Sequence, residues 1–313
     1  MPRNGSGTWA SLDPTWTQTL VRPRFGLLVG WWRDAVRSQL GETIEIGVRH
    51  RRRQKTEMTG TVERAASKVP EVTLVFWIIK IAATTLGETG GDTVTMTLNW
   101  GYLIGTALFL SLLPALVTLQ ITAKKFYPWL YWATIVASTT AGTTMADFAD
   151  RSLDIGYAGG STLLFVCLIT TLGAWYWSLG SISVATVSTP KVEAFYWVAI
   201  TFSQTLGTAL GDWMADSTGY EHGALIFAAG LAVLAAAYFW TNVSRVFLFW
   251  AAFILTRPLG ATVGDFLDKP ASNGGLALSR PIASAVIGVF IVACLLVLPQ
   301  RAGQHPGQSE PAS

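Results

Sequence analysis

Apolar residues along the chain gather into eight stretches of about 20 residues, separated by short polar or charged segments. A helix of about that length crosses a hydrocarbon core of roughly 30 Å. We therefore predict an all-α fold, a polytopic membrane helix bundle with eight transmembrane helices. The expected spans are residues 71–91, 100–122, 127–147, 157–178, 193–213, 221–241, 244–265 and 281–299.

The composition favours lipid over water as the solvent of this fold. Only 13% of the 313 residues are charged, 51% are hydrophobic and 14 are Trp, a balance too apolar for an ordinary soluble domain. The formal charge of +3 predicts no nucleic-acid partner, because most basic residues lie in one segment before the first span. No catalytic, phosphate-binding or cofactor motif is found, so we expect neither an enzyme nor a cofactor.

Two terminal segments contain no span. Residues 1–68 carry a basic run between His50 and Lys55, and we predict that this N-terminal extension is disordered. Alternatively, the reading frame is assigned too early and Met58 is the true start. Residues 301–313 are predicted to form a disordered tail, which leaves 69–300 as the transmembrane domain.

The loops on the two sides of the predicted bundle differ in basic residues. One side carries Arg64, Lys68, Lys124, Lys125, Lys191, Arg245 and Arg301. The other side carries Arg151, Lys269 and Arg280. Because Lys and Arg accumulate in cytoplasmic loops, we predict an inner (plasma) membrane protein with both termini in the cytoplasm.

A motif of the form aromatic-Trp-x9-Gly-x3-small-Asp occurs four times. Its central glycines are Gly87, Gly142, Gly207 and Gly260, which lie 55, 65 and 53 residues apart. Each copy therefore spans two helices, and all four insert in the same orientation. We predict parallel repeats near 69–122, 123–178, 190–241 and 244–299, packed about an axis along the membrane normal.

The second helix of each repeat is plainer than the first. Small residues such as Gly105 and Gly173 are expected to let these helices approach their neighbours closely. We interpret them as packing partners of the motif-bearing helices.

One face of the motif-bearing helix is polar in every copy. Positions three before, one after and five after the central glycine are four residues apart and share that face. They are Thr84, Glu88 and Asp92; Thr139, Thr143 and Asp147; Gln204, Thr208 and Asp212; and Arg257, Ala261 and Asp265, with Lys80 one turn before the first set. The glycines beside this polar stripe either admit close helix contact or loosen the helix to expose carbonyls.

A carboxylate at membrane depth costs about 2.5–3.5 kcal/mol, so these side chains should face a common interior instead of lipid. Hard oxygen ligands suit a small cation such as Mg²⁺, Ca²⁺ or Mn²⁺, although the residues do not identify the metal. The candidate ion-binding residues are Glu88, Asp92, Asp147, Asp212, Asp265, Thr84, Thr139 and Gln204. Lys80 and Arg257 are the predicted internal counter-charges.

A simpler interpretation treats the repeated aspartate as a helix stop in a solvated turn. It accounts for Asp147 with Asp150 and for Asp265 with Asp268. It accounts less well for Lys80, Glu88 and Arg257, which lie one to three turns deeper along their helices.

The stretch from Lys68 to Asp92 and the later Thr205-Leu-Gly-Thr-Ala-Leu-Gly-Asp212 carry specific motifs. On these residues the chain resembles, over about 68–300, a family of bacterial multi-pass proteins known only as uncharacterised membrane-anchored proteins. The resemblance implies a membrane location and no particular activity.

Two functions of different classes follow from these residues. The first is a secondary transporter or channel for a small cation, with divalent and proton-coupled cations as the candidates. The alternative is a non-transporting membrane scaffold or sensor subunit. The oligomeric state is not predicted.

Overall fold

The computed structural model describes residues 67–153 and 156–303, and within these ranges the chain is all-α. Its long helices are α2 (Leu74–Asp92), α3 (Gly101–Thr122), α4 (Pro128–Asp147), α5 (Tyr157–Leu179), α6 (Pro190–Thr218), α7 (Tyr220–Trp240), α8 (Arg245–Asp268) and α9 (Arg280–Val297). These bounds match the predicted spans within a few residues, except that α6 continues to Thr218. The extension up to residue 66, with the alternative start at Met58, and the tail from 304 lie outside the described residues.

Five of these helices, α3, α5, α7, α8 and α9, are long and apolar enough to cross a membrane. The other three, α2, α4 and α6, carry the polar stripe, which lowers their mean hydropathy. The described residues therefore have the helices of a membrane protein, although composition identifies five spans and not the predicted eight.

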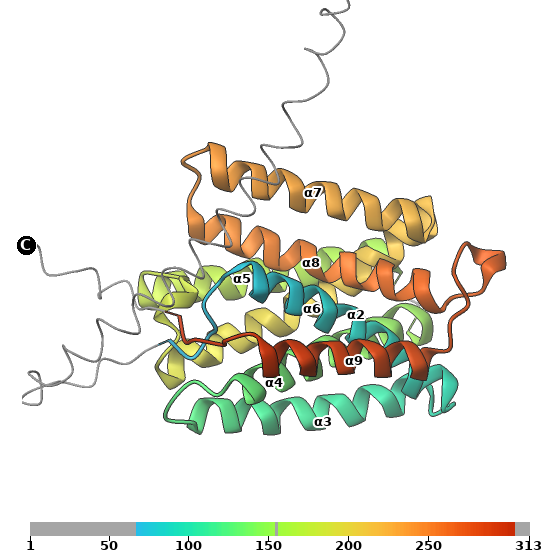
Figure 1. Ribbon diagram of the computed structural model, residues 1–313, viewed down its shortest axis with the longest axis horizontal. Helices are drawn as coiled ribbons and strands as arrows, with labels where there is room; N and C mark the ends of the chain where they lie inside the picture. Colours follow the sequence, from blue (N-terminus) through green and yellow to red (C-terminus); the bar gives the residue numbers. More distant parts are fainter. Residues whose placement is uncertain (1–66, 154–155, 304–313) are drawn as a thin grey trace, which may run out of the picture. The chain divides into compact units, whose positions relative to one another are not determined.

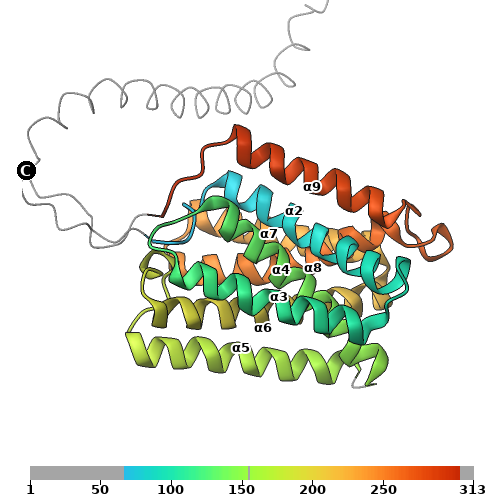
Figure 2. The same ribbon diagram turned by 90° about the horizontal axis from the view of Figure 1, so that it is seen from below.

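The first helices of the four repeats form a closed inner ring. In this ring α2 packs against α4, α4 against α6, α6 against α8, and α8 returns to α2. The second helix of each repeat covers the first helix of the next one: α3 lies on α4, α5 on α6 and α7 on α8, and α9 completes the ring on α2 (Figures 1 and 2). This arrangement agrees with parallel repeats around one axis.

The inner and covering helices differ sharply in burial. In the most apolar stretches of the covering helices, only 17% of residues in α3 and α5 and 11% in α7 and α9 are buried, whereas 56% are buried in α8 of the inner ring. Large side chains such as Trp177 and Val297 are 93% and 78% exposed. An outer surface of this kind suits contact with lipid tails.

The motif glycines allow the inner helices to approach closely. A Cβ atom at each central glycine would overlap the residue three before the glycine of the next helix in the ring. The pairs are Gly87 with Thr139, Gly142 with Gln204, Gly207 with Arg257 and Gly260 with Thr84. Of the two predicted roles, close helix contact is therefore the one observed, and α-helix continues through each glycine.

The two small residues of the covering helices behave differently. Gly105 packs against the Thr95 side chain, as expected, but Gly173 has no atom within 4 Å of an added Cβ. The prediction that Gly173 mediates close helix approach is wrong, because that side of α5 has no neighbouring helix.

Residues at both ends of the described chain belong to the bundle. Lys68, which we assigned to the extension, forms a buried ion pair with Glu193 at 2.6 Å. The amide of Gly303, which we assigned to the tail, donates to the carbonyl of Val69 at 2.8 Å. Lys68 and Gly303 therefore contact the helices and connecting segments of the bundle.

Candidate functional site

Side chains fill the interior of the inner ring in five levels, counted from the N-terminal ends of the inner helices. Successive levels are four residues, or about 6 Å, apart along the helices. In order they are Phe76, Tyr131, Tyr196 and Phe249; Lys80, Ile135, Ile200 and Phe253; Thr84, Thr139, Gln204 and Arg257; Glu88, Thr143, Thr208 and Ala261; and Asp92, Asp147, Asp212 and Asp265. None of these residues is more than 7% exposed. We call the fifth level the acid layer and the first the aromatic layer.

All the predicted ion-binding residues and counter-charges thus face one interior, as their spacing indicated. The alternative, in which the aspartates end their helices in solvated turns, agrees with the structure only in that α2 and α4 end at Asp92 and Asp147; all four aspartates are buried. Their exposure is 1% for Asp92, 2% for Asp147, 6% for Asp212 and 3% for Asp265. Helices α6 and α8 also continue past their aspartates, to Thr218 and Asp268.

Arg257, a residue of the third level, contacts residues of the fourth level from the other three repeats. Its Nη2 donates to Oε2 of Glu88 at 3.0 Å and to the hydroxyls of Thr143 and Thr208. Arg257 is fully buried and Glu88 is 2% exposed. Removing one partner of such a buried pair leaves the other charge uncompensated, which makes this network important for folding.

A lysine from outside the inner helices enters the acid layer. Lys269, the first residue after α8, places its Nζ against Oδ2 of Asp92, 2.9 Å from Oδ1 of Asp265 and 3.7 Å from Oδ1 of Asp268. Its backbone carbonyl accepts from the amide of Ala277 at 2.9 Å, which folds the α8–α9 loop over it. A side-chain cation is therefore already held by the carboxylates.

Burial alone lowers the pKa of Lys269, but the carboxylates of Asp265, Asp92 and Asp268 outweigh this effect and raise the pKa above its ordinary value. The ammonium form is thus favoured over the whole physiological pH range.

Three carboxylates at this end could share a metal ion. One oxygen from each of Glu88, Asp92 and Asp265 lies within 4.8 Å of the others. Carboxylate oxygens are the ligands that Mg²⁺, Ca²⁺ and Mn²⁺ prefer. The Lys269 ammonium lies against two of the three residues, so that it and a metal ion would compete for the same oxygens.

The other two aspartates of the acid layer are less fully paired. Nε of Arg151 donates to Asp147 at 2.8 Å, whereas Asp212 forms no ion pair with a described Lys or Arg and its Oδ2 has no hydrogen-bond partner there. Four aspartates facing Lys269 and Arg151 leave the acid layer with a formal charge of −2 when all are ionised. An additional cation or bound protons would balance this charge.

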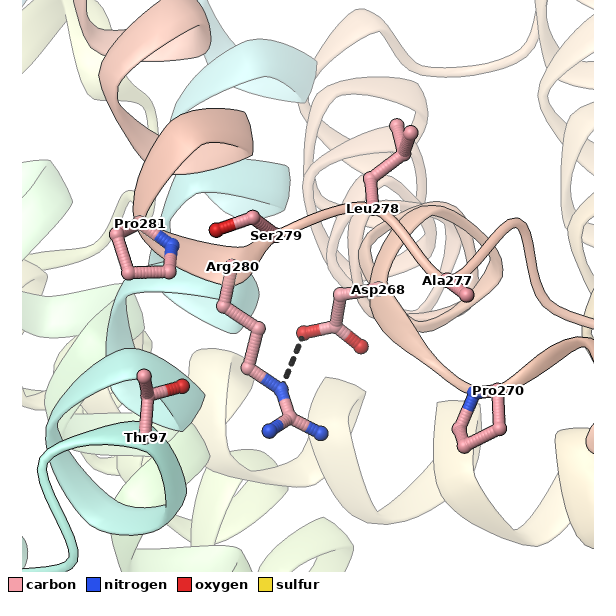
Figure 3. A pocket seen from close by; sticks show the side chains of 8 residues that line it. All are labelled: Thr97, Asp268, Pro270, Ala277, Leu278, Ser279, Arg280 and Pro281. Atoms are coloured by element: carbon pink, nitrogen blue, oxygen red, sulfur yellow. Dashed lines mark hydrogen bonds and ion pairs between the residues drawn. The ribbon is translucent and has the colours of Figure 1, made fainter.

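An open depression of about 340 Å³ lies beside the acid layer. Figure 3 shows Asp268 and Arg280 pointing toward one another across it, joined by an ion pair of 3.1 Å. Arg280 Nε is also 3.8 Å from Asp92 Oδ2. The depression therefore brings the surface close to the carboxylates that hold Lys269.

The opposite end of the interior is closed by rings. The hydroxyls of Tyr131 and Tyr196 are 2.6 Å apart, and the ring centroids of Phe76 and Phe249 are 6.2 Å apart. Just above this aromatic layer, Nζ of Lys80 lies 4.1 Å from the centroid of the Phe253 ring. The interior is therefore acidic at one end and aromatic at the other.

Lys269, Arg151 and Arg280 were predicted only as loop residues and not as partners of the acids. Two of them carried a usable signal, because Lys269 follows Asp265 and Arg151 follows Asp147 by four residues, the spacing of a helical ion pair. Arg280 had no such signal, because its pairing depends on the path of the α8–α9 loop.

The protein-family model described as Repeat of Unknown Function (DUF347) matches residues 75–126, 130–181, 195–244 and 248–300. The chain belongs to this DUF347 family. The match confirms the four internal repeats, and each DUF347 repeat supplies most of one inner helix and the whole of the helix that covers the next repeat.

No curated protein and no solved structure matches the chain. The DUF347 repeats are therefore interpreted from their own geometry. All four copies carry the aspartate of the acid layer, whereas the second, third and fourth levels differ from copy to copy. Lys80, Arg257 and Glu88 are each the one charged residue of their level.

Proposed function

We propose that this chain is a multi-pass protein of the inner (plasma) membrane that binds a small cation in the acid layer and moves it through the ring. One observation carries the proposal: carboxylates from different repeats already hold a cation, the Lys269 ammonium, and still keep a formal charge of −2. In a transport site, a free cation would displace the Lys269 ammonium and bind the same carboxylate oxygens.

All eight long helices cross the bilayer in this proposal. The three helices with lower hydropathy, α2, α4 and α6, turn their polar side chains toward the ring and are covered by α9, α3 and α5. Their charged residues therefore need not meet hydrocarbon, where an isolated charge costs several kcal/mol.

The charge distribution supports an orientation with both termini in the cytoplasm. At the acid end, Arg151, Lys269 and Arg280 are all engaged by carboxylates. At the other end, Lys124 and Lys191 are exposed, as basic residues of cytoplasmic loops usually are. The acid layer then faces the outside of the cell.

The chemistry of the acid layer favours a hard cation. Its charge of −2 would be neutralised by one divalent ion or by two protons, and the five interior levels contain neither His nor Cys. Mg²⁺, Ca²⁺ and Mn²⁺ are the candidates, with protons as a coupled or competing species. The proposal includes no catalytic step and no cofactor.

The test is Mn²⁺ uptake by liposomes that contain the purified chain and an internal dye quenched by Mn²⁺. Asp212→Asn removes the buried carboxylate that lacks a cation partner, so uptake should fall at least about tenfold. Asp216→Asn is the matched control, because Asp216 lies one turn further along α6 and is exposed. Absence of Mn²⁺, Mg²⁺ and Ca²⁺ flux in the unmodified protein would reject transport.

A non-transporting scaffold or sensor subunit is the second candidate. It is favoured by the interior packing, since the Arg257 network and the aromatic layer both lie across the path through the ring. A scaffold should co-purify with a partner and show no change of thermal stability with Mn²⁺. A sensor should bind Mn²⁺ without moving it.

A further inference from the structure

A second group of buried polar side chains lies deeper in the ring than the acid layer. It occupies the second and third levels and takes one residue from each inner helix: Lys80 of α2, Thr139 of α4, Gln204 of α6 and Arg257 of α8. Each is 0% exposed. We call these four residues the donor cup, because every one of them carries an N–H or O–H group.

Much of the hydrogen-bonding capacity of the donor cup is unused within the described residues. Nε and Nη1 of Arg257, Nε2 of Gln204 and Oγ1 of Thr139 have no partner there. Nζ of Lys80 has one long contact, 3.4 Å to Oε1 of Gln204, besides its position over the Phe253 ring. More than nine in ten buried polar groups in proteins are paired, so this concentration indicates an acceptor that binds among them.

The charge of this region identifies the kind of acceptor. Glu88, the only carboxylate that contacts Lys80 or Arg257 in the described residues, is paired with Arg257, so that the Lys80 ammonium has no counter-charge there. With Lys80 protonated, two positive charges and one negative charge leave a formal +1 in a region without solvent exposure. Water would satisfy the donors but leave the charge unbalanced, whereas a monovalent anion would satisfy both.

We propose that the donor cup binds one small monovalent inorganic anion, such as chloride, held by Lys80 and Arg257 with Gln204 and Thr139 as neutral donors. The anion lies roughly 12 Å below the acid layer, two levels of four residues each at about 1.5 Å per residue. The ligand, the residues and the charge differ from those of the proposed cation site, and the proposal holds whether or not a cation is transported.

The test is thermal unfolding of the full chain in nanodiscs, followed by Trp fluorescence, in sodium chloride, bromide or gluconate at equal ionic strength. Gluconate serves as the reference because it is a much larger anion than chloride or bromide. The chloride and bromide samples should unfold at least about 3 °C higher than the gluconate sample, because only a ligand bound to the native state stabilises it. Equal unfolding temperatures would mean that only water occupies the donor cup and would overturn the proposal.

Three variants locate the effect. Lys80→Met should abolish the chloride shift, and Lys191→Met, which removes an exposed lysine at the start of α6, should retain it. Gln204→Glu places a tethered carboxylate beside Lys80, so it should raise the unfolding temperature in gluconate and remove the response to chloride. This variant tests the proposal even when Lys80→Met does not fold, and an undiminished chloride shift in Gln204→Glu would contradict it.

Discussion

The inner and covering helices of this protein have opposite distributions of polar and apolar side chains. The inner helices bury charged and hydroxyl groups around a common axis, while the covering helices expose Leu, Val, Phe and Trp. In a soluble protein the apolar side chains would face inward, because water is the solvent. Here the apolar side chains face outward and the polar ones inward, the distribution expected of a helix bundle in lipid.

The two kinds of helix also differ in how tightly they pack. A Cβ at each central motif glycine of the inner helices would meet a side chain or backbone atom of the next inner helix, whereas at Gly173 and Gly288 of the covering helices it would have no neighbour within 4 Å. Functional constraints are therefore expected in the inner ring, and tolerance to substitution on the covering helices.

The largest contrast is expected from glycine substitutions. A Cβ at Gly142 would lie 2.9 Å from the carbonyl carbon of Gln204 and 3.0 Å from the amide nitrogen of Thr205, backbone atoms that cannot move without separating α4 from α6. Gly142→Leu should therefore cost at least about 3 kcal/mol and eliminate the folded peak in size-exclusion chromatography. Gly173→Leu should give the normal peak. Equal behaviour of the two variants would contradict the close packing of the inner ring.

A somewhat smaller effect is expected from the buried arginine. Arg257→Met leaves Glu88 without its cation and should lower the free energy of unfolding by about 3–5 kcal/mol in a denaturant titration. Arg245→Met, at an exposed arginine that begins the same helix, should change it by less than about 0.5 kcal/mol. Adding Glu88→Gln to Arg257→Met should recover part of the loss, and a loss that is fully additive would show that the two charges do not interact.

The sequence predicted the inner helices better than their surroundings. Four-residue spacing placed Thr84, Glu88 and Asp92 on one helical face, and repetition then implied a shared interior. Which covering helix contacts which inner helix depends on ring closure, and no local pattern encodes the contact of α9 with α2. The role of Lys269 was not predicted either, because a lysine in a loop is ordinarily solvated. Only the fold of residues 269–279 directs this side chain inward.

A change in cation affinity is expected at the acid layer. Lys269→Met removes the ammonium that competes for Asp92 and Asp265, so the Mn²⁺ concentration needed for half of the thermal stabilisation should fall about tenfold. Lys124→Met, at an exposed lysine of the opposite end, should leave it unchanged. Weaker Mn²⁺ binding in Lys269→Met would instead mean that Lys269 helps to organise the site.

The smallest expected effect is that of pH on the Lys269 ion pairs. Because the pKa of Lys269 is raised in the folded state, its stabilising contribution is complete below the unfolded value of about 10.4 and declines only as pH rises through the folded value. At pH values where Asp92, Asp265 and Asp268 are ionised, the difference in unfolding temperature between the unmodified protein and Lys269→Met should thus be constant up to about pH 9. A difference that declines within this range would show that Lys269 loses its proton there.

Ring closure is the feature on which the common interior depends, and a disulfide across it tests it most directly. Oγ of Ser284 in α9 lies 2.9 Å from Oγ1 of Thr89 in α2. In a chain whose two native cysteines, Cys167 and Cys294, are replaced by Ala, Thr89→Cys with Ser284→Cys should form an intramolecular disulfide on mild oxidation. When a protease then cuts the chain between α6 and α7, the fragment that contains residue 89 and the fragment that contains residue 284 should stay linked until the disulfide is reduced.

Thr89→Cys with only the native Cys167 of α5 retained is the control and should not cross-link. The account predicts efficient cross-linking within single chains for the first pair alone. No cross-link, or a cross-link only between chains, would contradict a ring closed by the first and last repeats.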